Sequence, residues 1–289
     1  MTVFGFLNID KPLGMTSHDV VAKVRRGLKI KKVGHAGTLD PLATGVLVVC
    51  VGAATRLSEY VMHTTKRYRA QIHLGVTTET YDAEGEVIRH VDASHVTRAD
   101  FEAALAQFQG EIEQLPPMYS AIKQGGRKLY ELARAGETVE RPARPVTIHA
   151  LDVVDWSPPQ VTVDVVCSSG TYIRSLAYDV GEALGVGAHL SGLVRTASGS
   201  FDLARAVGLE TLLNSDNPHQ YLITPDEALH PMPVVDMDAE AVEALVHGRV
   251  VPSAGAAAGT LAQAYSPDGV FIAIVEAEGH AWRPRKVFV

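Results

Sequence analysis

The sequence contains very little cysteine. Of its 289 residues only Cys50 and Cys167 are cysteines, and neither belongs to a closely spaced group of Cys or His. This spacing excludes the usual zinc signatures. Both cysteines lie in apolar, strand-like runs, which is typical of buried, reduced thiols in the cytosol. We therefore expect a cytoplasmic protein without a metal site.

Long apolar runs and nucleotide-binding motifs are also missing. No uninterrupted apolar stretch reaches the length of a membrane span, and residues 1–6 lack the basic start and apolar core of a signal peptide. The chain has neither a Walker loop nor a GxGxxG motif. We expect no membrane contact and no nucleotide cofactor. The apolar fraction of 46% and the charged fraction of 20% instead fit a globular enzyme.

An excess of positive charge, which is usual in nucleic-acid-binding proteins, is absent too, because the formal net charge is −7. The acidic residues, however, concentrate in residues 79–113 and 236–243, whereas the basic residues gather elsewhere. Each basic group alone fits a solvated face, but four groups in an acidic chain allow a local phosphate-binding surface. The groups are Lys23, Arg25, Arg26, Lys29, Lys31 and Lys32; Lys66, Arg67 and Arg69; Lys123, Arg127 and Lys128; and Arg283, Arg285 and Lys286.

Strands and helices follow one another irregularly along most of the chain. Capping residues and apolar periodicity predict a mixed α+β arrangement rather than a doubly wound sheet. The expected strands span 7–12, 46–51, 66–74 and 161–167, the expected helices span 16–28, 53–62, 97–108, 128–135 and 173–184, and residues 75–85 form a loop.

A domain boundary is expected near residue 230, where a polar connection and several prolines occur. The tail predicts a helix at about 238–247 and strands near 260–265, 269–276 and 284–289, with a hairpin turn between the first two strands. We therefore expect a large domain, 1–230, and a small one, 231–289. Residues 115–145 form an irregular basic excursion, and an excursion of this length is uncommon unless it is functional or disordered.

The segment from Gly34 to Val46, GHAGTLDPLATGV, contains a single carboxylate, Asp40. An apolar run typical of a buried strand follows it directly. A rigid strand can fix such a loop, so Asp40 is well placed to act as a nucleophile or a base. The alternative is that Asp40 and Pro41 only form a turn, because both residue types favour turns.

Other side chains could join Asp40. Arg174 is expected in the first turn of a helix, where its charge opposes the helix dipole and calls for a nearby anion; otherwise it is an exposed helix residue. Tyr68 and Tyr172 could stack on a base, or simply pack in the core. His35, flanked by small residues, is expected to swing freely, and Lys11 contacts either a phosphate or solvent.

Several ordered motifs together resemble the TruB-type tRNA pseudouridine synthases, which convert uridine 55 in the T arm of transfer RNA. The resemblance spans residues 7–195. The motifs are DKPLGMTS at 10–17, GHAGTLDPLATGV at 34–46, KRY at 66–68, PMYSA at 117–121, GTYIRSL at 170–176 and GAHL at 187–190.

This resemblance implies a pseudouridine-synthase fold, with a mixed, mainly antiparallel sheet flanked by helices, and a small PUA-like β domain at the C-terminus. Residues 115–145 resemble the family's RNA-clamping insertion. The resemblance also implies base flipping, cleavage of the glycosidic bond and reattachment through C5, without a metal, redox or nucleotide cofactor. The partner would be the T arm of tRNA, without an obligate protein partner, and the protein would be a monomer.

The resemblance further implies roles for individual residues. Asp40 would be the catalytic aspartate, attacking either ribose C1′ or the uracil ring. Arg174 would pair with Asp40, and Tyr68 would stack on the flipped uracil and could take a proton. Tyr172 and Leu193 would shape the base pocket. His35 would enter the RNA stack, and Asp82 would support the loop that holds it. Lys11 would stabilise the loop near the site. The loop glycines would let the backbone approach RNA closely.

Three alternatives stay open at this point. A guide-RNA-dependent pseudouridine synthase shares the catalytic motifs. An RNA-binding or tRNA-folding module would use the same surface without relying on catalysis. An Asp-nucleophile hydrolase would need a second acid or a metal, and the sequence does not single out a second acid.

Overall fold

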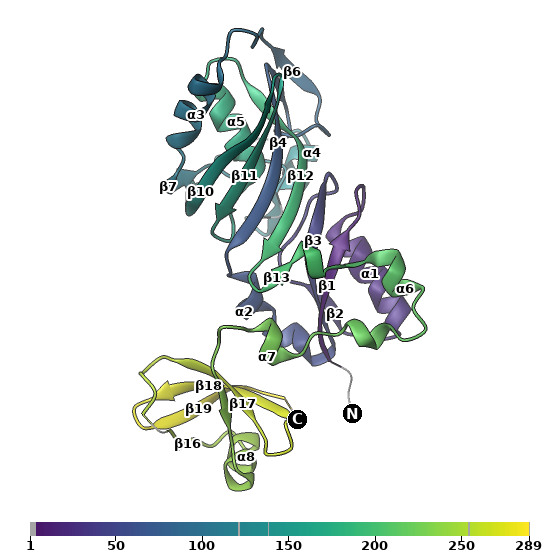
Figure 1. Cartoon of the computed structure of the whole chain (residues 1–289), viewed down its shortest axis with the longest axis vertical. Coiled ribbons are helices and arrows are strands. Elements are labelled where there is room, and N and C mark those ends of the chain that lie inside the picture. The colour runs from purple at the N-terminus through teal and green to yellow at the C-terminus, as the bar shows by residue number, and fades with distance from the viewer. Residues whose placement is uncertain (1–3, 121, 138, 254, 289) are drawn as a thin grey trace.

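The computed structural model describes residues 4–120, 122–137, 139–253 and 255–288. It consists of a large part built around one long sheet and a smaller C-terminal part with its own sheet (Figure 1). Among these residues no helix has both the length and the apolarity to span a membrane.

The large sheet has ten strands and is mixed, with mainly antiparallel pairs. The order along its path is β14-β1-β3-β12-β4-β11-β10-β7, β2 pairs with β3, and β13 pairs with β12. Only the β1–β14 and β3–β12 pairs in this sheet are parallel. The strands are β1 Gly5–Lys11, β2 Val33–His35, β3 Ala43–Val51, β4 Lys66–Leu74, β7 Gly110–Gln114, β10 Arg144–Ser157, β11 Gln160–Cys167, β12 Ala188–Ser198, β13 Phe201–Asp202 and β14 Val207–Gly208.

Helices cover one face of this sheet. The apolar stripes of α1 (Ser17–Leu28), α3 (Arg98–Ala106), α5 (Ile173–Ala183) and α6 (Leu209–Leu213) belong to one buried cluster together with residues of the strands. Both α1 and α3 begin with a capping box, at Thr16 and Thr97. These local signals set the start of each helix, and burial of the apolar face holds it against the sheet.

Strand β3 is buried on both faces, which explains its continuous apolar sequence. Its alternate residues Leu47 and Val49 face the helix layer. Val48 and Cys50 face a second cluster. That cluster includes the 3₁₀ helix η1, Gly52–Leu57, and reaches side chains of the C-terminal part. The loop before β3 is therefore attached to one of the most deeply buried strands.

The smaller part has a five-stranded sheet in the order β15-β17-β18-β19-β16, against which α8 packs. Its elements are β15 Val234–Asp236, α8 Ala239–Val246, β16 Val251–Pro252, β17 Leu261–Tyr265, β18 Phe271–Glu278 and β19 Ala281–Val287. The connection contains η2 Leu203–Arg205, η3 Pro218–Tyr221 and α7 Pro225–Ala228. The predicted α+β class, with a mixed, mainly antiparallel sheet and a C-terminal β domain, is confirmed.

Some predicted boundaries differ from the structure. The strand predicted at 46–51 begins at residue 43, because residues 43–45 pair with β12. The helix predicted at 53–62 is split into η1 and α2, Ser58–Met62. The loop predicted at 75–85 contains β5, Val76–Thr78, which pairs with β6, Val87–His90.

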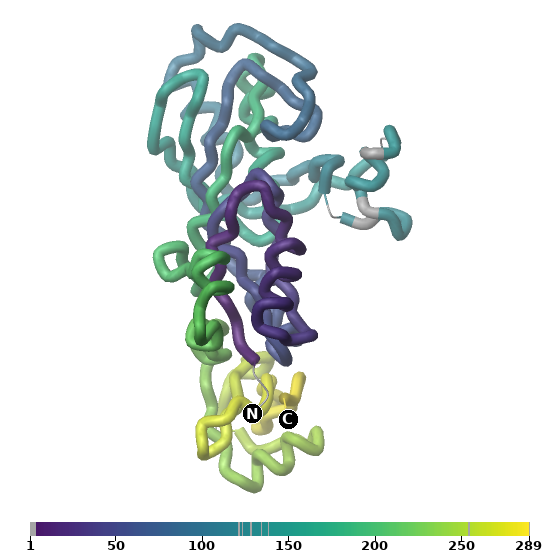
Figure 2. The backbone as a smooth tube through the Cα atoms, turned by 90° about the vertical axis from the view of Figure 1, so that its right-hand side faces the viewer, coloured from purple at the N-terminus to yellow at the C-terminus, as the bar shows by residue number. Residues whose placement is uncertain are grey.

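The irregular segment 115–145 projects sideways from the body of the molecule (Figure 2). It holds a small hairpin and one short helix between β7 and β10; these are β8 Lys123–Gln124, β9 Arg127–Lys128 and α4 Leu129–Arg134. Ala121, the last residue of the PMYSA motif, lies outside the described residues. The segment thus reaches away from the sheet, while its first residues start beside the site described next.

Candidate active site

Asp40 lies on the loop that connects β2 to β3. The loop is closed at both ends by backbone hydrogen bonds. The amide of Ala36 donates to the carbonyl of Val48 at 2.9 Å, and the amide of Ala43 donates to the carbonyl of Asp40 at 3.0 Å. The Asp40 side chain nevertheless remains 41% exposed. A fixed loop therefore presents a carboxylate that a substrate can reach.

The buried side chain of Arg174 forms an ion pair with this carboxylate. Its Nε lies 2.9 Å from Asp40 Oδ2, and its side chain is only 6% exposed. The two Nη atoms donate to the carbonyls of Thr80, at 3.2 Å, and Tyr119, at 2.8 Å. The predicted pairing of Arg174 with Asp40 is thus present. Because the guanidinium is fixed on several sides, it orients the carboxylate as well as offsetting its charge.

A second carboxylate, Asp82, also faces Arg174. Its Oδ2 lies 3.4 Å from Nη1 of Arg174, and its side chain is 4% exposed. Its Oδ1 accepts hydrogen bonds from the Thr80 hydroxyl and from the amide of Glu84. Arg174 sits in the first turn of α5, so these two carboxylates offset the unfavourable helix dipole.

The expected support of the His35 loop by Asp82 stays a prediction. Within the described ranges, the hydrogen bonds and ion pairs of the Asp82 side chain join it to Arg174, Thr80 and Glu84. The Thr80 carbonyl and the Asp82 carboxylate both contact the guanidinium, so this loop is connected to α5. Arg174 thus lies between Asp82 and Asp40.

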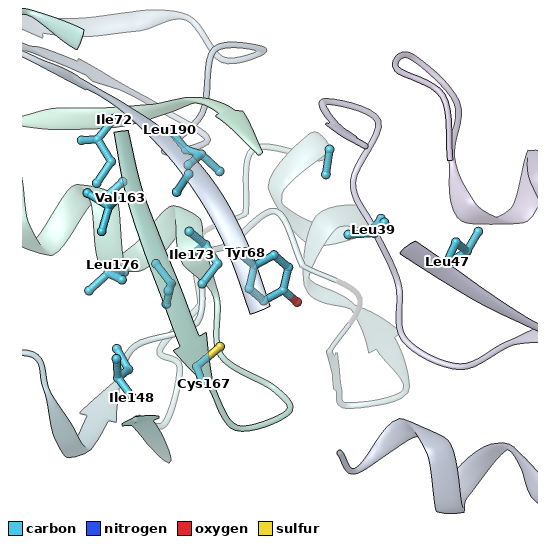
Figure 3. Packing of buried hydrophobic residues seen from close by; sticks show 14 of the residues in the cluster. Leu39, Leu47, Tyr68, Ile72, Ile148, Val163, Cys167, Ile173, Leu176 and Leu190 are labelled. Carbon is cyan, nitrogen blue, oxygen red and sulfur yellow. The ribbon is translucent and has the colours of Figure 1, made fainter. Parts of the chain in front are cut away.

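Tyr68 lies on β4 with its ring in the apolar core, 9% exposed. Figure 3 shows the ring near Ile173 and Cys167, with its hydroxyl pointing toward the segment that carries Leu39. Burial raises the pKa of the Tyr68 phenol, while the charge of Arg195 acts in the opposite direction. Tyr68 is both a core residue, as its strand pattern indicates, and a phenol directed at the Asp40 loop.

Lys11 is a fully buried lysine at the end of β1. Its ammonium donates to the carbonyls of Met15 at 2.6 Å and Pro12 at 2.9 Å, and reaches that of Pro41 at 3.5 Å. Burial lowers the pKa of Lys11 to about 8, while Asp40 raises it. Through its contact with Pro41, Lys11 can stabilise the Asp40 loop, as the resemblance implied.

His35 differs from its prediction. The small residues around it predicted a side chain free to swing, but His35 ends strand β2 and pairs with Val49. Its ring meets the ring of His18 edge-on, with centroids 5.2 Å apart, and its Nδ1 is buried. Burial lowers the pKa of His35 to about 4, with the charges of His18 and Arg195 adding to the effect. Packing thus holds the neutral ring in place.

Tyr172 and Leu193 border the same region from two other elements. Tyr172 is the N-cap of α5, and its amide and carbonyl are both bound by the side chain of Gln114. Burial raises the pKa of the Tyr172 phenol. Leu193 lies on β12 opposite Ala43, three residues after Asp40. The structure therefore brings segments distant in the sequence around the Asp40 loop.

Two further residues of this region were missed from the sequence. Ser17, 1% exposed, accepts from the amide of Leu39 at 2.8 Å and donates to its carbonyl at 3.0 Å. Arg195, also 1% exposed, donates to the carbonyls of Gly37 and Thr38. In a sequence, a serine before a helix indicates a capping residue, and an arginine in a strand indicates a surface residue. No local signal therefore indicated that these two side chains hold the Asp40 loop.

Two of the loop glycines have a role in the fold itself. Gly45 pairs with Arg195 at a φ of +92°, and a Cβ added there would overlap the Arg195 carbonyl. Gly37 has a φ of +102°, and its added Cβ would stand 3.5 Å from Nη1 of Arg195. Both positions favour glycine for their backbone conformation, and Gly45 also for its close contact with β12. The expected close approach of the loop to RNA stays a prediction.

The described residues contain no group of three or more His, Cys, Asp and Glu side chains placed to hold a metal ion. What they contain is an accessible carboxylate paired with a buried guanidinium, and a phenol directed at the same loop. Such a group of side chains can attack an electrophilic carbon and can stabilise charge on a bound planar ring.

Family models cover most of the chain. The TruB family pseudouridylate synthase N-terminal domain matches residues 25–173. The tRNA pseudouridylate synthase B C-terminal domain matches residues 174–232, and the tRNA pseudouridine synthase II C-terminal model matches residues 232–289. The residues from Asp40 to Arg195 therefore lie within matched regions.

Curated relatives agree with these models. The tRNA pseudouridine synthase B of Symbiobacterium thermophilum is 55% identical over 249 residues, 85% of this chain and 82% of the relative. That of Thiobacillus denitrificans is 48% identical over 289 residues, 99% of this chain and 96% of the relative. Similarity thus extends through both parts of the molecule.

Solved structures show the same fold at lower identity. The chain is similar to a protein of a Cbf5-Nop10-Gar1 complex, with a TM-score of 0.76 and 30% identity over 99% of this chain and 85% of that one. It is equally similar, at 28% identity, to a chain of an H/ACA RNP bound to a substrate RNA containing 2'-deoxyuridine, with the same coverage. The models, the relatives and the fold lead to one conclusion: this chain belongs to the TruB family of pseudouridylate synthases.

Proposed function

We propose that this protein converts uridine 55 in the T arm of tRNA to pseudouridine. The observation that carries the proposal is the accessible Asp40 carboxylate held by the buried guanidinium of Arg174. The names of the relatives, tRNA pseudouridine synthase B, support tRNA as the substrate. We further propose a cytoplasmic monomer that needs neither a cofactor nor an obligate protein partner.

Asp40 is proposed to attack the flipped nucleoside, at ribose C1′ or at the uracil ring. The bond from C1′ to N1 breaks and a bond from C1′ to C5 forms, while C5 loses a proton and N1 regains one. Atoms and electrons balance without an oxidant or reductant. Flipping the base out of its stack costs a few kcal/mol, which contacts in the site must offset.

The neighbouring side chains have distinct proposed tasks. Tyr68 stacks on the flipped uracil and carries a proton, and Arg174 keeps Asp40 oriented. Tyr172 and Leu193 shape the base pocket, since Leu193 pairs with Ala43 beside the Asp40 loop and Tyr172 caps the helix that carries Arg174. His35, a half-buried neutral ring beside His18, occupies the space that the flipped base leaves.

The two parts of the chain also have proposed tasks. Residues 1–230 form the catalytic domain and residues 231–289 a small PUA-like domain, which agrees with the C-terminal model beginning at residue 232. Residues 115–145 clamp RNA, an idea supported by their projection from the body and their start beside Arg174 (Figure 2).

Tritium release tests this function directly. A T-arm stem-loop carrying C5-tritiated uridine is incubated with the purified protein alone, beside a stem-loop whose target uridine is replaced by cytidine. The proposal predicts tritium release from the first RNA only. Release that requires an added guide RNA would favour the guide-dependent alternative. Tight binding without any release would favour an RNA-folding module.

A further inference from the structure

Arg195 is a buried arginine in the middle of the large sheet. It lies on β12 and is 1% exposed, although arginine is among the residue types least often buried. Its Nε donates to the carbonyl of Val46 at 2.7 Å, Nη2 to that of Gly37 at 3.1 Å, and Nη1 to that of Thr38 at 3.4 Å. All three acceptors belong to the Asp40 loop or to the start of the strand that follows it.

Within the part of the chain that the structure describes, no ion pair joins a carboxylate to this guanidinium, and the ion pairs of the site involve Arg174. A buried cation is costly unless pairing and hydrogen bonds compensate it. Here the loop carbonyls supply those hydrogen bonds, so the conformation of the loop and the burial of Arg195 depend on each other.

The backbone of the loop is shaped to fit this side chain. Gly37 brings its carbonyl to Arg195 through a φ of +102°, and Gly45 lets the Arg195 backbone approach closely through a φ of +92°. A residue with a side chain would be strained at either position. At Gly37 the loop therefore contacts the side chain of Arg195, and at Gly45 it contacts the backbone of Arg195.

Arg195 also faces the proposed proton carrier. In the sheet it is the direct cross-strand neighbour of Tyr68, and its positive charge lowers the pKa of the Tyr68 phenol against the larger effect of burial. Arg195 thus contacts the Asp40 loop and lies beside Tyr68, the ring proposed to stack on the base. The Asp40 loop and Tyr68 belong to separate elements of the fold.

We propose that Arg195 is a positioning residue that fixes the Asp40 loop relative to Tyr68. This inference rests on the proposed roles of Asp40 and Tyr68. Displacing a reactive group by about 1 Å can cost on the order of 100-fold in rate, so a brace between the two groups acts on catalysis without contacting the substrate. Its loss affects kcat more than KM, because substrate contacts remain.

Two variants test the brace. Arg195→Lys keeps the positive charge, but one ammonium cannot reach carbonyls on both sides of the loop. Gly37→Ala keeps Arg195 and disturbs the same contact from the other side. Both are expected to lower kcat for a T-arm stem-loop by about 10- to 100-fold, with KM changed by less than about twofold. Amide hydrogen exchange at residues 37–40 is expected to speed up in both.

The matched control is Asn8→Leu. Asn8 is another buried polar residue of the large sheet, 3% exposed, on β1. Its side-chain amide donates to the carbonyl of Asp202 at 2.8 Å and not to the Asp40 loop. Asn8→Leu is expected to lower the unfolding temperature without changing kcat per folded molecule.

The outcomes distinguish a failure of the role proposed for Arg195 from a failure of the proposed function. Wild-type kcat in Arg195→Lys and Gly37→Ala, with Asp40→Asn inactive, overturns the brace alone. A loss of kcat in Asn8→Leu as large as in Arg195→Lys also overturns it, since a general packing defect then explains both. Full activity in Asp40→Asn overturns the proposed function and the brace with it.

Discussion

Arg174 contacts two carboxylates that differ in exposure, with the Asp40 side chain 41% exposed and the Asp82 side chain 4% exposed. Arg174→Lys retains the charge but loses the fork of donors that reaches both. We expect kcat to fall by about 100-fold or more, measured as single-turnover tritium release. Arg69→Lys is the control, because Arg69 also pairs with a carboxylate through two donors, but in an exposed position, at Asp164. Equal losses in both variants would contradict a special role for Arg174.

Also at the scale of single residues, His35 provides a prediction for the pH dependence of folding stability. Burial lowers the pKa of His35 to about 4 in the folded protein, below its ordinary value of 6.5. Between these values the unfolded chain binds a proton that the folded protein excludes, so stability rises with pH. The stability present above pH 6.5 is lost as the pH falls toward 4.

Urea unfolding at a series of pH values checks this behaviour. His35→Gln is expected to flatten the rise between pH 4 and 6.5, because it removes the titrating group. Asp179 supplies a contrast, since burial raises its pKa to about 6 and its contribution has the opposite sign. Asp179→Asn is therefore expected to steepen the rise. An unchanged slope in His35→Gln would show that the ring is protonated normally in the fold.

At the scale of elements, α1 connects its own N-terminus to the Asp40 loop through Ser17. Ser17→Ala leaves the buried amide and carbonyl of Leu39 without this partner, which costs about 1–3 kcal/mol. We expect a lower free energy of unfolding together with a lower kcat. Thr97→Ala, which breaks the capping box of α3, is expected to cost about 1 kcal/mol. It lies far from the loop along the fold, so a fall in its kcat would contradict this argument.

Local patterns were the predictable part of these elements. The capping box at Thr97, the alternation through Tyr68 and the placement of Arg174 in a first turn all follow from residues close in sequence. The resemblance supplied the pairing of Arg174 with Asp40. By contrast, the burial of Arg195 depends on carbonyls brought to it by pairing between β3 and β12. His35 was misjudged for the same reason, since pairing with β3 fixes it.

At the scale of the whole molecule, an apolar cluster joins the two parts of the chain. It combines residues of β1 and β3, such as Phe6 and Val48, with Phe271 and Phe288 of the C-terminal part. Polar contacts surround it, since Arg56 donates to the carbonyl of Val287 at 2.6 Å and stands over the Phe288 ring. The C-terminal β domain therefore shares a core with the back of the strand that anchors the Asp40 loop.

Phe288→Ala tests this shared core. We expect the free energy of unfolding to fall by about 3–5 kcal/mol, measured by urea denaturation. Activity on an isolated stem-loop should persist at temperatures where the variant is folded, because the ring does not contact the site. Val270→Ala, at a position 44% exposed, is the control and is expected to change stability by less than about 0.5 kcal/mol. Equal effects in the two variants would indicate independent domains.

The proposed function depends on the carboxylate of Asp40. It is tested by the single-turnover rate of C5-tritium release from a T-arm stem-loop by wild type and Asp40→Asn, at enzyme concentrations that saturate binding of the RNA. Because asparagine preserves shape and removes the nucleophile, we expect normal binding and a loss of turnover of at least about 10,000-fold. Tritium release by Asp40→Asn at the wild-type rate would show that another group performs the isomerisation.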